Sequence, residues 1–224
     1  MKRTSLILVV FLFAEIARAG SPPITGAVTP RVAMIIISKE LHKLNDLDKA
    51  YVDAFTILRE DNACSRLYGG PGAIDALNEL VRNFRPVYLD KHIAVRMRGN
   101  TTMYRNGVTG FSYRMFEKAE INIAGSFYRA NAPSGGHVPS IAHYQPNTRQ
   151  SRVALLLHEL GHLVRGADKK WVLSDDGHDL NLSIKNTEHV VEACRDEIES
   201  VTRMTIADQL EEPLSTIAQL AIQP

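Results

Sequence analysis

The sequence predicts an α+β fold with a small, mostly antiparallel sheet, one buried metal-binding helix and further helices. Three observations predict it. Apolar residues recur at helical spacing near both ends of the chain, and the middle alternates as strands do around an Asn-Gly turn. Residues 153–164 form an apolar run that contains two histidines. A chain of 224 residues is long enough to bury a sizeable core in one domain.

The N-terminal segment has the three parts of a secretory signal peptide. Two basic residues, Lys2 and Arg3, precede the apolar run 6–13, and small residues flank Arg18 at the end of the segment. The apolar run is well short of the roughly 20 residues that span a bilayer. We therefore expect a signal peptide over residues 1–19, cut after Ala19, and a secreted or periplasmic protein with no stable membrane anchor.

Helices are expected at the start of the mature chain. Residues 20–31 are proline-rich and should form a flexible leader. A single domain is expected over residues 32–224. It should begin with helices over residues 32–44, 47–58 and 73–84, because apolar residues there recur at spacings of three and four.

The middle of the chain is expected to be β. The Asn106-Gly107 pair predicts a hairpin, because an Asn-Gly pair suits the tight turn between two antiparallel strands. Strands are expected over residues 93–97, 101–104, 110–116 and 119–128. A long loop over residues 130–146 follows, and loops of that length are often functional.

The buried helix and two further helices are expected in the last third. Asn147 is a candidate N-cap for the buried helix, with Gln150 three residues later, and Gly166 should end the helix. Further helices are expected over residues 183–202 and 205–222.

The buried helix contains the most specific motif of the chain. His158 and His162 are four residues apart, so they lie on one face of a helix and can bind one ion. Glu159 is rotated about 100° from His158 and therefore lies beside that ion, where it can accept a proton from water. Gly161 lets another part of the chain approach closely. This pattern is typical of zinc-dependent metallopeptidases and predicts a Zn²⁺ cofactor.

Charge and cysteine content restrict the partners and the compartment. With 26 basic and 25 acidic residues the chain is nearly neutral, which argues against a nucleic-acid partner. Cys64 and Cys194 are the only cysteines. A lone pair of cysteines in an exported protein favours a disulfide over a metal site or a nucleophile.

The order of elements resembles the zincin fold. In zincins an edge strand beside the active helix receives the substrate as an additional strand, and residues 119–128 are the candidate for this strand. The segment from Asp175-Asp176-Gly177 to Asn186-Thr187 is similar to the arrangement in aspzincins. It is also similar to a group of uncharacterised exported bacterial proteins, over about residues 155–194 and more faintly 64–80. This resemblance implies Asp176 as the third ligand of the zinc ion.

Three other acidic residues are alternatives for the third ligand, namely Asp168, Asp175 and Glu188. Asp168 would fit a metzincin-like arrangement, but the glycine of that pattern falls one residue late, at Gly166. Aspartate before glycine is also common in turns, which gives Asp176 a second possible role.

These observations predict an exported zinc-dependent endopeptidase that hydrolyses a protein or peptide substrate. Glu159 would act as the general base, and His178, Tyr144 or His143 would steady the oxyanion. One alternative is a catalytically inactive zincin-like domain that binds a partner. The other is a structural zinc protein in which His178 or Asp168 supplies a fourth ligand.

Overall fold

The computed structural model describes residues 45–133, 135–177 and 179–205, all within one compact unit. The expected signal peptide, leader and helix over residues 32–44 lie outside these ranges, as do His178 and the helix expected after Thr205. Among the described residues, no helix has the length and apolar character needed to cross a membrane. The elements in chain order are α3 (Asp46–Arg59), α4 (Ala63–Leu67), α5 (Ala73–Asn83), β1 (Phe84–Val87), β2 (Val95–Arg105), β3 (Ser112–Asn122), α6 (Arg149–Gly161) and α7 (Leu180–Arg203).

The three strands form a sheet in the order β1-β3-β2. β3 pairs antiparallel with β2 and parallel with β1. The expected α+β class is confirmed, but the sheet is mixed, because β1 was not expected from the sequence. Its four residues include Pro86, which lacks an amide hydrogen and is tolerated on the edge of a sheet.

The expected hairpin is present, and the four strands expected from the sequence form two longer strands, β2 and β3. A bulge between Arg98 and Thr101, where Gly99 has φ +89°, joins the strands expected over residues 93–97 and 101–104. β3 likewise spans two expected strands and ends at Asn122, earlier than expected. The Asn122 side chain accepts hydrogen bonds from the Leu89 and Ala124 amides and thereby fixes the turn that ends the strand.

The expectation that residues 119–128 form the free edge strand was wrong. β3 is the central strand and has a partner on both sides, so its backbone cannot accept another chain. β2 has only one strand partner among the described residues. β2 is therefore a strand with a free edge.

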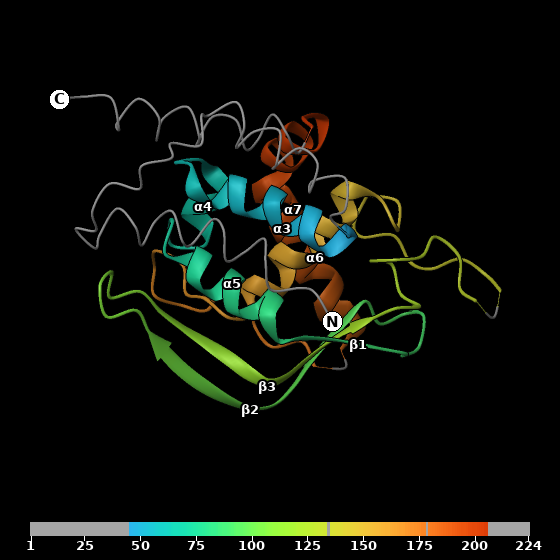
Figure 1. Ribbon diagram of the computed structural model, residues 1–224, viewed down its shortest axis with the longest axis horizontal. Coiled ribbons are helices and arrows are strands. Elements are labelled where there is room, and N and C mark those ends of the chain that lie inside the picture. The colour runs from blue at the N-terminus through green and yellow to red at the C-terminus, as the bar shows by residue number, and fades with distance from the viewer. Residues whose placement is uncertain (1–44, 134, 178, 206–224) are drawn as a thin grey trace, which may run out of the picture. The chain divides into compact units, whose positions relative to one another are not determined.

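The helices form a layer against the sheet, with α6 at the centre (Figure 1). α6 packs against α3, α5 and α7, and ten of its 13 residues are buried. The buried phenol of Tyr68 donates a hydrogen bond to the Leu157 carbonyl, 2.8 Å away. The apolar run that contains the two histidines is therefore the core of the domain, as its composition predicted.

The ends of α6 differ from those expected. Thr148, not Asn147, is the N-cap, and it forms a reciprocal capping box with Ser151. The helix ends at Gly161 rather than near Gly166. The reason is pairing with the sheet, because the Leu163 carbonyl accepts the Arg114 amide at 2.8 Å.

α7 runs antiparallel to α6, and its C-terminal end is hydrogen-bonded to the start of α6. Arg149, at the start of α6, donates to the Thr202 carbonyl at the end of α7. α7 begins at Leu180, three residues before the expected position, with Asp179 as its N-cap. The expected disulfide between Cys64 and Cys194 is present and joins α4 to α7.

Candidate metal centre

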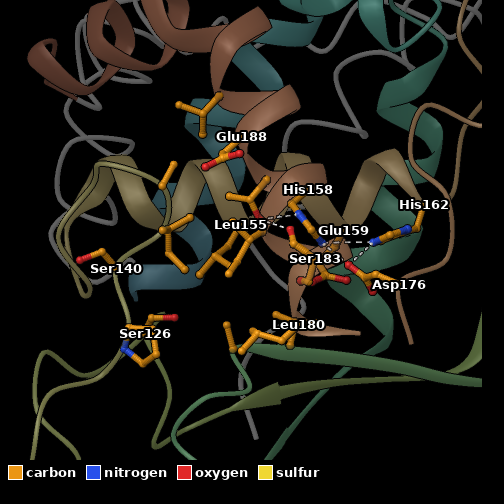
Figure 2. A pocket seen from close by; sticks show the side chains of 18 of the residues that line it. Ser126, Ser140, Leu155, His158, Glu159, His162, Asp176, Leu180, Ser183 and Glu188 are labelled. Atoms are coloured by element: carbon orange, nitrogen blue, oxygen red, sulfur yellow. Dashed lines mark hydrogen bonds and ion pairs between the residues drawn. The ribbon is translucent and has the colours of Figure 1, made fainter. Parts of the chain in front are cut away.

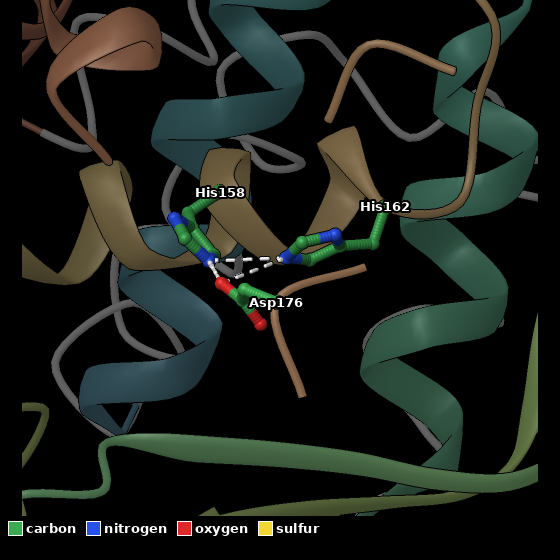
Figure 3. A group of neighbouring side chains, drawn as sticks. All are labelled: His158, His162 and Asp176. Atoms are coloured by element: carbon green, nitrogen blue, oxygen red, sulfur yellow. Dashed lines mark hydrogen bonds and ion pairs between the residues drawn. The ribbon is translucent and has the colours of Figure 1, made fainter. Parts of the chain in front are cut away.

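Three side chains converge at the C-terminal end of α6 (Figure 3). His158 Nε2 and His162 Nε2 are 3.1 Å apart. Asp176 Oδ2 lies 3.3 Å from the first nitrogen and 3.5 Å from the second. Atoms bound at about 2.0–2.1 Å to a tetrahedral zinc ion lie roughly 3.3–3.4 Å from one another. The triangle of potential ligand atoms therefore has the dimensions of one face of a zinc coordination sphere.

The chemistry of these three atoms also favours a bound cation. A neutral imidazole nitrogen that carries no hydrogen presents a lone pair, and an ionised carboxylate presents only acceptors. Both histidines are buried and Asp176 is largely so. Burial raises the pKa of Asp176, but the two neighbouring imidazoles outweigh this effect and hold that pKa well below its usual range, so the carboxylate is ionised. Such a group of acceptors could hold a metal ion.

Asp176 reaches the histidines because its loop folds back onto the end of α6. The Val172 amide donates to the Val164 carbonyl at 3.1 Å, and the Leu173 amide donates to the Gly161 carbonyl at 3.0 Å. A side chain at position 161 would overlap Leu173, because a Cβ there would lie 2.6 Å from Leu173 Cγ. The close approach expected at Gly161 is therefore made by the loop that carries Asp176.

Arg114 fastens the same loop to the helix. Its Nε donates to the His162 carbonyl at 2.6 Å, and its two terminal nitrogens donate to the carboxylate of Asp175. The guanidinium also lies over the ring of Trp171, 4.1 Å from the centroid. Sequence reasoning missed Arg114, although an arginine between aromatic and apolar strand residues is a signal of a buried polar contact.

Two consecutive residues of α7 contact the ligands, and sequence reasoning assigned neither of them a role. Thr187 Oγ1 lies 3.0 Å from His158 Nδ1. The amide nitrogen of the buried Asn186 donates to the Ser174 carbonyl at 3.0 Å and lies 3.5 Å from Asp176 Oδ2. Both residues are in the second turn of α7, which begins at Leu180.

Glu159 lies beside the triangle and is not one of its three members (Figure 2). Its side chain is buried, and burial raises its pKa while the neighbouring histidines lower it. A carboxylate with a raised pKa holds a proton more firmly, which suits a group that takes a proton and later returns it.

A cavity of about 1380 Å³ opens onto the three potential ligands and Glu159. One wall is formed by residues 92–97, which lead into and begin β2, and a second by the loop over residues 139–143. The wall formed by α7 includes Leu180 and Ser183 (Figure 2). Thr187 lines the same wall, since its spacing from these residues places it on the same face of the helix. The long loop expected to be functional therefore contributes to the same cavity as the metal-binding motif.

The alternative acidic ligands lie away from the triangle. Asp175 is bound by Arg114. Asp168 is exposed, and its Oδ1 accepts the Lys170 amide at 3.0 Å. Glu188 is exposed on α7, where it lines the cavity but does not join the group. Of the four acidic residues considered from the sequence, Asp176 alone is brought to the histidines.

Two of the three candidate oxyanion donors lie in the described ranges. His143 lines the cavity and is exposed. Tyr144 is buried against the core and does not line the cavity, and its hydroxyl has no hydrogen-bond partner among the described residues. Tyr144 is therefore poorly placed for the role expected of it.

Comparison of the chain with protein-family models, with curated proteins and with solved structures found no match. The site is defined by its own geometry: two histidines of one helix, a carboxylate from a following loop and a buried glutamate beside them.

Proposed function

We propose that the protein is an exported zinc-dependent endopeptidase. The observation that carries the proposal is the convergence of His158, His162 and Asp176 at 3.1–3.5 Å, with Glu159 beside them in an open cavity. Three protein ligands and an adjoining space are typical of catalytic zinc sites, whereas structural sites are closed by a fourth protein ligand.

The metal would be zinc, held by the two imidazole nitrogens and the Asp176 carboxylate. Zinc in such a site polarises a carbonyl group and lowers the pKa of a water molecule to about 7. Glu159 would accept the proton of that water and deliver it to the leaving amine of the substrate. Its burial supports this role, because a desolvated carboxylate with a raised pKa can both take and return a proton.

The substrate would lie along the free edge of β2. Residues 93–97 line the cavity, and the backbone of an edge strand can pair with an extended peptide. This strand replaces the one expected from the sequence. A peptide paired there would pass through the cavity that contains Glu159 and the potential ligands, which supports cleavage within a chain.

The proposal is tested by zinc content and peptide hydrolysis. Purified protein should contain about one zinc ion per chain and cleave a proteome-derived peptide library, with cleavage lost on chelation and restored by zinc. Glu159→Gln should keep zinc and fold but lower turnover by about 100-fold or more, the usual size of a general-base effect. Glu188→Gln is the matched control, because Glu188 lines the same cavity outside the ligand group.

Two outcomes would contradict the proposal. Full activity of zinc-loaded Glu159→Gln would remove this residue from the mechanism. Zinc-loaded wild-type protein that cleaves no peptide of the library would instead support a zincin-like domain that binds a partner.

A further inference from the structure

Thr187 makes two hydrogen bonds that together determine where its hydroxyl hydrogen lies. Thr187 Oγ1 is 2.9 Å from the Ser183 carbonyl oxygen and 3.0 Å from His158 Nδ1. A carbonyl oxygen can only accept, so the hydroxyl donates its single hydrogen to Ser183. The remaining lone pairs of Oγ1 can therefore only accept a hydrogen from His158.

This arrangement bears on the one tautomer of His158 that can bind a metal through Nε2. A neutral imidazole has one N–H group, and the nitrogen without hydrogen is the donor to a metal. His158 directs Nε2 into the triangle with His162 and Asp176. An acceptor at Nδ1 favours the tautomer with hydrogen on Nδ1 and leaves the Nε2 lone pair free.

We propose that Thr187 is a positioning residue that holds the hydrogen of His158 on Nδ1 and so makes Nε2 a metal ligand. The inference rests on the proposed metal centre but does not require peptidase activity. Partners of this kind orient the ring and increase the basicity of the ligating nitrogen, and their loss costs about 10–100-fold in metal affinity.

α7 supplies a matched control for this contact. Thr202, just over four turns further along the same helix, also donates its hydroxyl hydrogen to the carbonyl four residues earlier, at 2.6 Å from Ile198 O. Both threonines are half-buried. Thr202 does not contact a ligand of the triangle, so replacing either threonine removes the same helical hydrogen bond, and only one replacement changes His158.

The experiment measures Zn²⁺ affinity and the histidine N–H resonance in four proteins. Wild type, Thr187→Val, Thr187→Ser and Thr202→Val are compared by competition with a chromogenic chelator. In the zinc-loaded proteins, the Nδ1–H signal of His158 is followed by NMR, and its assignment in wild type comes from its proximity to the Thr187 methyl group. The probe is the metal alone, so the result does not depend on knowing a substrate.

Thr187→Val is expected to bind zinc about 10–100-fold more weakly than wild type. Its Nδ1–H should also exchange with solvent faster, because the acceptor is gone. Thr187→Ser keeps the hydroxyl and should retain both properties, as should Thr202→Val. If Thr187→Val does not fold by circular dichroism, Thr187→Ala takes its place.

Several outcomes would overturn the assignment. They are wild-type affinity in Thr187→Val, a protected Nδ1–H in that variant, no protected Nδ1–H in the wild type, or an equal loss of affinity in Thr202→Val. Failure of the proposed function is seen separately: zinc binding that depends on Thr187, without peptide cleavage, would leave this inference intact and refute the peptidase.

Discussion

Gly161→Ala is expected to weaken metal binding although it changes no ligand. Gly161 is the last residue of α6, and a Cβ there would lie 2.6 Å from Leu173 Cγ and 2.8 Å from its Cδ1. Non-bonded carbons approach to about 3.5–4.0 Å, so Leu173 would have to move by about 1 Å. Leu173 is buried, so its side chain has no free space to move into. Its amide donates a hydrogen bond to the Gly161 carbonyl, so the loop backbone lies directly against the helix end and must shift when the side chain is displaced.

The displacement reaches the ligand because Asp176 is three residues further along the same loop. A movement of about 1 Å is half of the roughly 2 Å between zinc and a ligand atom, so zinc affinity should fall by at least about 10-fold. Overpacking of this kind should also cost about 1–3 kcal/mol of folding free energy. Zinc affinity is measured by chelator competition and the free energy of unfolding by urea titration.

The control is the double variant Gly161→Ala/Leu173→Ala. Shortening Leu173 removes both atoms that the new methyl group would meet, so zinc affinity should recover relative to the single variant. Wild-type affinity in Gly161→Ala, or no recovery in the double variant, would refute the steric link between the helix end and the ligand loop.

The remaining predictions concern the ligand, the disulfide and an ion pair of the sheet. Asp176→Ala removes a ligand, so zinc affinity should fall by more than the roughly 100-fold that loss of a residue contacting a ligand can cost. Asp168→Ala should change zinc affinity little, and the opposite ranking would restore the metzincin-like alternative. Thiol titration of denatured, unreduced protein should find no free thiol, and two per chain would exclude the disulfide between α4 and α7. Hydrogen bonds from Arg98 and Arg96 lower the pKa of Glu120 to about 2, against the competing effect of burial. Glu120→Gln should therefore cost up to about 1 kcal/mol at pH 7, where the carboxylate is ionised, and the difference should vanish as the pH falls from about 4.5 to 2; a constant difference in urea midpoints would contradict this.

The elements that depend on local sequence were predictable. The helix over residues 47–58 and the helix over residues 73–84 were found because apolar spacing reports one buried face. The hairpin was found, although its strands are joined by residues 106–111 and not by the tight Asn-Gly turn expected. Asn106 still shapes this loop, because its side chain accepts the Val108 and Thr109 amides. These features require only neighbours within a few residues.

Features set by distant parts of the chain were not predictable in the same way. The apolar pattern of α6 continues to Val164, yet the helix ends at Gly161 because the following residues pair with β3. β1 is four residues long and contains a proline, so its identity as a strand depends on the parallel partner that β3 supplies. The edge strand was misassigned for the same reason, because strand order is a property of the whole sheet.

The third ligand shows how a distant contact resolves a local ambiguity. Asp175 and Asp176 are adjacent and chemically identical, and their spacing from the histidines does not distinguish them. Arg114, a residue of β3, holds the carboxylate of Asp175 together with the His162 carbonyl. With Asp175 fixed toward the sheet and Leu173 packed on the glycine of α6, Asp176 is the residue directed to the two imidazoles. The motif on α6 thus provides two potential ligands, and the selection of the third is made by β3 and the packing of the loop.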